Sequence, residues 1–257
     1  MTELTFLGTG TSQGVPVIAC NCRVCGSIDF RDKRLRTSAY VKFNGYSIVI
    51  DTGPDFRQQM LRENITHVDA VLFTHAHKDH TAGMDDIRSF NFKDQRDMPV
   101  YATAQVIEQL KQEFAYAFSP VKYPGTPSID LREINKHPFV MDDGQTTIIP
   151  IEVMHYRLPV MGFRFGNLTY ITDANYIAPE EMAKIEGSEI LVINALRKEK
   201  HISHFNLEEA LAIVERIRPR MAYLTHISHH LGLHAEVSQE LPANVQLAYD
   251  GLKVQAG

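Results

Sequence analysis

The sequence feature that most constrains the fold is the segment at residues 74–80, Thr-His-Ala-His-Lys-Asp-His, which holds four metal-ligand side chains. It follows a short apolar run at 71–73 that favours a strand, so we expect a loop at the end of a buried strand. A turn there can aim several imidazoles and a carboxylate at one point. These ligand types together suit zinc, manganese or iron, and without a cation they would repel one another or stay unsatisfied. The segment therefore predicts a metal site.

A second candidate site gathers all three cysteines of the chain, Cys20, Cys22 and Cys25. An odd number of crowded cysteines, in a chain that begins without a signal-peptide pattern, argues against a disulfide framework. Thiolates this close can converge on one soft cation, and a tetrahedral zinc ion would need a fourth ligand from elsewhere. The alternatives are unrelated reduced thiols or a redox pair, but the spacing favours a structural zinc ion.

Composition narrows the class of protein. The 257 residues are 44% hydrophobic and 22% charged, which is typical of a globular chain that buries a core without disulfides. The net charge of −5 gives no overall attraction to nucleic acid or an anionic membrane, and no apolar run reaches bilayer-spanning length. Linkers, low-complexity tracts and short repeats are missing from the sequence. We expect a cytoplasmic protein with no membrane partner and a single domain over residues 1–257.

Two hairpin signals divide the chain into similar halves. Asn44-Gly45 separates expected strands at 40–43 and 46–50, and Gly166-Asn167 separates expected strands at 162–165 and 168–171. Helices are expected at 56–62, 104–118 and 207–217, with another starting in 82–90, and further strands at 68–74, 189–193 and 221–225. The two halves predict two sheets packed face to face with helices outside. The proline-rich segment 119–127 is either a lid over the site or a plain connection.

Apolar strands are followed at once by a carboxylate or an imidazole at Asp51, His75, Asp173 and His226. Strand ends that gather polar residues at one edge of a sheet make a composite site. His155 also follows a strand; alone, it and His226 would read as ordinary core histidines, but their positions favour metal binding. Asp51 is better explained as a hydrogen-bonded partner of the histidine segment than as a ligand.

These residues resemble the metallo-β-lactamase superfamily, and the resemblance runs through essentially the whole chain. It implies an α/β fold, the αβ/βα four-layer sandwich, with two mixed β-sheets between outer helices. It implies two divalent ions, zinc or manganese, the first held by His75, His77 and His155, the second by Asp79, His80 and His226, with Asp173 bridging both. A hydroxide shared by the two ions would attack a phosphorus ester, and Asp79 would belong to the catalytic set.

Three further features resemble one branch, the cyclic phosphate phosphodiesterase of phosphonate breakdown. The first is residues 7–16, Leu-Gly-Thr-Gly-Thr-Ser-Gln-Gly-Val-Pro, followed by Cys-x-Cys-x-x-Cys. The second is Thr-His-x-Ser-His at 225–229, which implies that His229 completes a structural zinc site with Cys20, Cys22 and Cys25. The third is the segment 201–207, which implies that His204 contacts the scissile phosphate, with His201 as the competing candidate. His230 and His234 are expected at solvated surface positions.

The resemblance implies hydrolysis of a small phosphodiester, either a cyclic ribosyl phosphate or a nucleotide, and it also implies a homodimer. One rival is an endoribonuclease that processes the 3′ end of transfer RNA, which would need a basic surface or an arm to hold the RNA backbone. The negative net charge disfavours this rival, although it does not exclude nucleic acid as a partner. The other rival is a non-catalytic metal-binding module, against which the intact ligand set argues.

Overall fold

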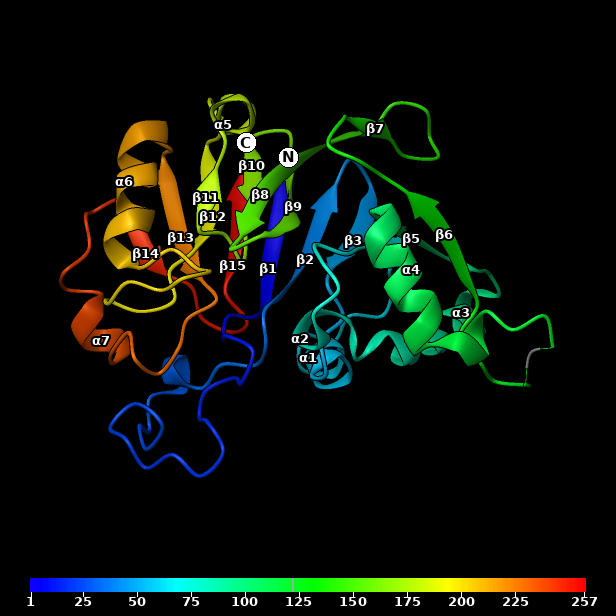
Figure 1. Ribbon diagram of the computed structural model, residues 1–257, viewed down its shortest axis with the longest axis horizontal. Helices are drawn as coiled ribbons and strands as arrows, with labels where there is room; N and C mark the ends of the chain where they lie inside the picture. The colour runs from blue at the N-terminus through cyan, green and yellow to red at the C-terminus, as the bar shows by residue number, and fades with distance from the viewer. Residues whose placement is uncertain (122) are drawn as a thin grey trace.

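The computed structural model describes residues 1–121 and 123–257, in which two β-sheets lie face to face between layers of helices (Figure 1). Within the described residues the first sheet has the order β15-β1-β2-β3-β4-β5-β6. Its strands are β1 (Thr2–Gly8), β2 (Ser38–Phe43), β3 (Tyr46–Ile50), β4 (Ala70–Leu72), β5 (Met98–Ala102), β6 (Ile129–Glu133) and β15 (Lys253–Ala256). Both ends of the chain therefore contribute to this sheet.

The second sheet has the order β11-β8-β9-β10-β12-β13-β14, and β7 pairs with β8 outside this path. Its strands are β7 (Phe139–Val140), β8 (Thr147–His155), β9 (Leu158–Phe165), β10 (Leu168–Tyr170), β11 (Tyr176–Ile177), β12 (Ile190–Asn194), β13 (Met221–Thr225) and β14 (Val245–Leu247). Each sheet mixes antiparallel hairpins with a parallel run, β3 to β6 in the first and β10, β12, β13 and β14 in the second.

The α-helices cover the outer faces of the sheets. They are α1 (Phe56–Arg62), α2 (Lys78–Thr81), α3 (Arg88–Asp94), α4 (Ala104–Glu113), α5 (Pro179–Ile185), α6 (Leu207–Ile217) and α7 (His234–Val237). Three 3₁₀ turns are described as well, η1 (Phe30–Asp32), η2 (Met84–Ile87) and η3 (Ala115–Ala117). In Figure 1, α1 to α4 lie beside the first sheet, and α5 to α7 beside the second. None of the helices in the described part of the chain has the length and hydropathy needed to cross a membrane.

Strand β3 shows how the layers follow from the sequence. Successive strand residues point to opposite faces, and a sheet covered on both faces needs apolar residues in both directions. Ile48 and Ile50 accordingly enter the core between the sheets, whereas Val49 packs under the helices with Phe56 of α1 and Leu110 of α4. A third cluster packs α5 and α6 against the second sheet. The four-layer sandwich of two mixed sheets predicted from the sequence is confirmed.

Both predicted hairpins are present, β2–β3 and β9–β10, and α1 and α6 have the expected bounds. The helix expected at 104–118 instead ends at Glu113, because Phe114 leaves helical geometry and a 3₁₀ turn follows. The helix expected to start in 82–90 is split into η2 and α3.

The segment 119–127 includes residue 122, which lies outside the described residues. Within its described part, residues Tyr123 to Thr126 line a cavity with Phe92 of α3 and Tyr116 of η3. Whether the segment is a lid or a connection stays a prediction.

Candidate metal centres

The histidine-rich segment folds back on the end of strand β3. His75 lies in the loop after β4, His77 precedes the first turn of α2, and Asp79 and His80 lie on α2. Two glycines allow this close approach: a Cβ atom on Gly53 would lie 2.2 Å from the carbonyl oxygen of Asp79, and one on Gly83 would lie 2.1 Å from that of Gly53. The backbone of α2 therefore rests directly on the turn that follows β3.

Asp51, the first residue after β3, anchors this segment. Its Oδ1 accepts a hydrogen bond from the backbone N–H of Thr74 at 2.8 Å, and its Oδ2 accepts one from Nδ1 of His80 at 2.7 Å. Asp51 and His80 are both fully buried. The structure thus places Asp51 as a partner of the histidine segment, as the sequence predicted, and orients the Nε2 atom of His80 away from it.

Three rings use Nδ1 in the same way. Nδ1 of His75 lies 3.0 Å from the Thr74 hydroxyl oxygen, which donates its own hydrogen to Asp51, so this ring nitrogen donates. Nδ1 of His155, at the end of β8, donates to the carbonyl oxygen of Ser203 at 2.8 Å. With His80 fixed by Asp51, Nδ1 is engaged in all three rings, which leaves Nε2 as the ring atom available to bind a metal ion.

Asp173 lies at the centre of the cluster, three residues after β10. Its Oδ1 lies 3.1 Å from Nε2 of His226 and 3.1 Å from Nε2 of His204, and its Oδ2 lies 3.3 Å from Nε2 of His80. His226 directly follows β13, and Asp79 reaches both His80 and His226, at 3.2 and 3.9 Å. Asp173 therefore contacts imidazoles from three distant segments of the chain.

The structure brings all seven predicted ligands of this centre together. Potential ligand atoms lie within 4.8 Å of one another in three sets: His75, His80 and Asp173; Asp79, His80 and His226; His155, Asp173 and His204. The second set is the predicted one, and Asp173 belongs to two sets, as a bridging group would. His75, His77 and His155 do not form one such set, but their rings are neighbours, with centroids 4.6 to 5.8 Å apart. We call these seven residues the histidine–aspartate centre.

Electrostatics at this centre favour positive charge. Burial opposes it, yet Asp173 and Asp79 raise the pKa of His226 to about 9, and Asp173, Asp51 and Asp79 together raise the pKa of His80 well above its usual value. Nε2 of each ring is buried and makes no hydrogen bond to any residue in the described part of the chain. Carboxylates that stabilise a proton here would equally stabilise a divalent cation, so the donor set fits a metal ion.

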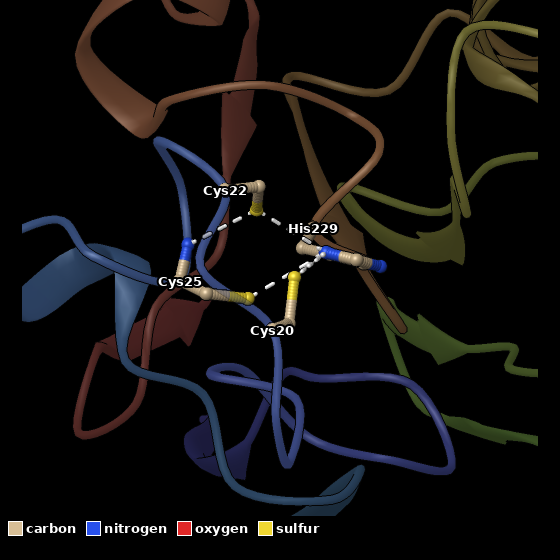
Figure 2. Close-up of side chains that lie close together, drawn as sticks. All are labelled: Cys20, Cys22, Cys25 and His229. Atoms are coloured by element: carbon tan, nitrogen blue, oxygen red, sulfur yellow. Dashed lines mark hydrogen bonds between the residues drawn. The ribbon is translucent and has the colours of Figure 1, made fainter.

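The second candidate centre lies on the loop between β1 and η1, and Figure 2 shows its four side chains converging. Nδ1 of His229 lies 3.4 Å from the sulfur of Cys20, 3.3 Å from that of Cys22 and 3.5 Å from that of Cys25. The four ligand atoms lie within 4.8 Å of one another. A hydrogen bond from the backbone N–H of Cys25, helped by His229, lowers the pKa of the Cys22 thiol to about 6. This thiol–histidine centre offers the Cys₃His set of a tetrahedral structural zinc ion.

One short segment after β13 carries a ligand of each centre, His226 and His229. Between them, Ile227 exchanges backbone hydrogen bonds with the first loop: its N–H donates to Thr9 and its carbonyl accepts from Thr11. Ser228 donates to the carbonyl oxygen of Leu196 at 2.8 Å through its hydroxyl group. The spacing of the two centres is therefore set by a rigid turn.

Residues 46–227 match the family described as β-lactamase superfamily domain, and all seven residues of the histidine–aspartate centre lie within this range. The chain belongs to the metallo-β-lactamase superfamily. A solved structure described as a new diphosphatase from the PhnP family is 38% identical, with a TM-score of 0.92 over 100% of this chain and 98% of its own. This likeness places the chain near the PhnP branch of the superfamily, in agreement with the branch predicted from the sequence.

Two further relatives show how far the likeness extends. An octanoyltransferase of Porphyromonas gingivalis is 41% identical over 96% of this chain and 50% of its own length. Zn²⁺-bound PqqB from Methylobacterium extorquens is 18% identical, with a TM-score of 0.78 over 99% of this chain and 100% of its own, which is a likeness of fold. The chain spans about half the length, or less, of the curated relatives it matches first.

The two histidines predicted as candidates for phosphate contact, His204 and His201, lie beside the histidine–aspartate centre. His204 is buried with its Nε2 atom at Asp173, and its ring lies 4.5 Å from that of His155 and 4.8 Å from that of His226. His201 lies one layer farther out, with its Nδ1 atom 3.2 Å from Nδ1 of His204. The geometry thus puts His204, rather than His201, against the ligands.

The expected surface position of His234 is wrong, although His230 is exposed as expected. His234 is 5% exposed, and its Nδ1 atom lies 3.2 Å from the Arg34 guanidinium. A lone histidine in a polar segment gives no sign of a partner two hundred residues away. The sequence reading also gave no role to Asn194, whose amide exchanges two hydrogen bonds with the backbone of Ala174 and so fixes the turn that carries Asp173. Its only signal was its place at the end of β12.

Proposed function

We propose that this protein is a metal-dependent phosphodiesterase that hydrolyses a small phosphodiester, either a cyclic ribosyl phosphate or a nucleotide. The observation that carries the proposal is the position of Asp173, within 3.3 Å of imidazoles from three distant segments. Identity of 38% to a diphosphatase of the PhnP family, over nearly the full length of both chains, supports phosphorus chemistry at such a centre.

Two divalent ions, zinc or manganese, would be held by the histidine–aspartate centre, with His75, His77 and His155 on one side and Asp79, His80 and His226 on the other. When bound, such a pair lowers the pKa of a shared water molecule and stabilises the charge on the attacking and leaving oxygens of a displacement. Asp173 and Asp79 offset part of the crowded positive charge. Asp51 keeps the His80 ring in its tautomer and orientation.

His204 is the residue of this chain placed to act on the substrate. Burial lowers its pKa to about 4, and its Nδ1 atom lies 3.1 Å from the Ser203 hydroxyl, so the ring is held without relying on substrate. A phosphoryl group held by two divalent ions would lie beside this ring, where the imidazole would hydrogen-bond a phosphoryl oxygen or, once protonated, protonate the leaving oxygen. His201 would support this ring from the solvent side.

The thiol–histidine centre would hold a structural zinc ion, with Cys20, Cys22, Cys25 and His229 as its ligands. A site of this kind has no open position, so its contribution is to folding rather than to turnover. We further propose that the protein forms a homodimer, works in the cytoplasm and does not need nucleic acid as a partner, in keeping with its net charge of −5.

The octanoyltransferase relative does not lead us to propose acyl transfer. That relative is about twice as long as the region matched, so its activity and the matched region need not coincide. Transfer through an acyl-enzyme needs a nucleophile poised beside a base. All three thiols of this chain instead converge on His229, a geometry that suits a metal ion.

A substrate panel tests the proposal after the metal content of the purified protein has been measured. We expect metal-dependent cleavage of bis(p-nitrophenyl) phosphate, and among a small cyclic phosphate, a linear dinucleotide and a transfer-RNA precursor the fastest turnover on one of the first two. Fastest turnover on the precursor would favour the endoribonuclease instead. Bound metal without cleavage of any of the four would favour a binding module.

A further inference from the structure

Three exposed apolar side chains lie close in sequence to residues of the histidine–aspartate centre or to His204 beside it. Tyr156 is 49% exposed, Tyr176 is 54% exposed and Ile202 is 66% exposed. Tyr156 directly follows His155, and Tyr176 lies three residues after Asp173. Ile202 lies two residues before His204, whose ring contacts Asp173. An apolar rim beside a charged centre is not needed for folding, since exposed side chains contribute little burial.

Asn175 joins the three parts of this rim. Its side-chain oxygen accepts a hydrogen bond from the backbone N–H of Tyr156 at 2.7 Å, and its side-chain nitrogen donates to the carbonyl oxygen of Ile202 at 3.2 Å. Its own backbone N–H donates to Met154 at 2.8 Å. The rim is therefore a fixed surface rather than three independent loops.

Tyr156 adopts a backbone conformation that does not suit a tyrosine. It is the first residue of the two-residue turn between β8 and β9, whose ends pair as His155 with Leu158, and its φ angle is +58°. Such a position usually goes to glycine, because a side chain there is strained. Strain that the fold tolerates at the edge of a site points to a use for the side chain.

The Tyr156 ring also has a preferred binding face. The guanidinium carbon of Arg157 lies 5.1 Å from the centre of the ring, within the range of a cation–π contact. This contact occupies one face and leaves the other for a flat group. Arg157 also brings positive charge to the rim, which suits a ligand with a phosphate.

We propose that Tyr156, backed by Arg157, is a stacking platform for the base of a nucleotide whose phosphodiester lies at the histidine–aspartate centre. This inference rests on the proposed function and narrows its substrate class, from small phosphodiesters in general to nucleoside phosphodiesters. Every nucleobase has a π-face, and stacking on an aromatic side chain strengthens binding by roughly 5- to 150-fold. A bare sugar phosphate would gain nothing from this rim.

The test compares adenosine 2′,3′-cyclic phosphate with methyl riboside 2′,3′-cyclic phosphate, which has the same reacting group and no base. In the Tyr156→Gly variant, we expect the ratio of kcat/KM for the first substrate over the second to fall about tenfold or more, mainly through KM. Tyr156→Phe keeps the ring and should keep the ratio. Phe92→Ala, which removes a ring 54% exposed on α3, is the matched control and should also keep it.

Stability separates a lost platform from a damaged fold. Glycine suits a positive φ angle, so Tyr156→Gly should unfold at the same temperature as the wild type or higher. An unchanged ratio in Tyr156→Gly, or an equal loss in Tyr156→Phe, would overturn the platform while leaving phosphodiester hydrolysis intact.

Wild-type protein that cleaves neither substrate, and does not cleave bis(p-nitrophenyl) phosphate or a linear dinucleotide either, would overturn the proposed function instead. Calorimetric titration with adenosine 2′-monophosphate and with ribose 5-phosphate then decides on the platform. Weaker binding of the nucleotide alone in Tyr156→Gly would support it, and equal binding to wild type and variant would overturn it.

Discussion

The two candidate metal centres are built in opposite ways. The histidine–aspartate centre draws its residues from the ends of β8, β10 and β13, from the loop after β4 and from α2, so two sheets and their cores hold it in place. His75, His80, Asp173 and His226 are each at most 2% exposed. The thiol–histidine centre takes three ligands from one loop that is outside both sheets (Figure 1), and its Cys22 is exposed. The first centre is formed by the fold, whereas the second would help to order the loop that carries its cysteines.

The apolar support of the two centres differs in the same direction. Around the thiol–histidine centre the buried hydrophobic cluster in the described residues comprises only Val15, Val24 and Cys25, with Val17, Cys20 and Leu233 packed against it. So small a cluster cannot order a loop of this length by burial alone. A bound ion would add its own free energy to folding there, while the histidine–aspartate centre would keep its shape without one.

The largest expected effect is that of Asp173→Asn, which removes the shared charge of the first centre without changing its size. Turnover should fall on the order of 10⁴-fold or more, because charge stabilisation and water activation are lost together. Elemental analysis should show loss of the metal ions of this centre and retention of one zinc ion per chain. Loss of the zinc ion as well would contradict the separation of the two centres, and unchanged metal content would contradict the role of Asp173 as a shared ligand.

His204→Ala should have the next largest effect, because His204 is the residue placed to act on the substrate. The thiol–histidine centre has no equivalent of this residue. We expect turnover to fall about 10²- to 10³-fold while metal content stays that of the wild type. We expect a much smaller loss of turnover in His201→Ala, since the His201 ring lies on the outer side of the His204 ring. Turnover in His204→Ala equal to that of the wild type would remove this residue from the mechanism.

His229→Ala should act on stability instead of turnover. Removing the fourth ligand should release the structural zinc ion, which at a thousandfold excess over its dissociation constant stabilises the fold by about 4 kcal/mol. Chemical unfolding with zinc present measures this loss, and metal in the first centre should be retained. His230→Ala is the matched control, because His230 is the exposed neighbour of His229 and does not belong to the Cys20, Cys22, Cys25 and His229 set. Equal stability of the two variants would refute a structural zinc ion.

The parts of this molecule that could be predicted from the sequence are those set by local chemistry. Asn44-Gly45 and Gly166-Asn167 fix two hairpins because few other residues accept the turn geometry. The motif at 74–80 and the three cysteines predict metal sites because their donors are adjacent in sequence. The pattern of polar residues at strand ends also predicted that Asp173 and His226 lie close to that motif.

What could not be predicted depends on contacts between distant segments. The end of α4 at Glu113 is decided by how Phe114 packs in the core with η3, not by helix propensity. The positive φ angle of Tyr156 is imposed by the pairing of β8 with β9, and glycine would have been the expected residue there. The buried position of His234 requires Arg34, which no local pattern connects with it.

Substitution of His234 should have the smallest effect. It tests how the thiol–histidine centre is held against the rest of the fold. This ring lies at the start of α7, next to Leu233, which packs on the apolar cluster of the thiol–histidine centre. Burial, and then the positive charges of Arg34 and Arg31, lower the pKa of His234 to about 4, although Asp29 and Asp32 oppose them. The ring is therefore neutral in the folded protein and can accept the hydrogen bond from Arg34.

The unfolded chain has the ordinary histidine pKa of about 6.5, so between pH 6.5 and 4 it binds more protons than the folded protein. The stability that the neutral ring contributes is present above pH 6.5 and is lost as the pH falls towards 4. After allowance for solvent screening, we expect about 1–2 kcal/mol. Acid also protonates the metal ligands, so only the difference between wild type and His234→Gln isolates this ring. Urea unfolding at pH 7.5 and pH 5 should show a smaller loss of unfolding free energy in the variant than in the wild type. Equal losses would show that His234 does not help to hold the thiol–histidine centre in place.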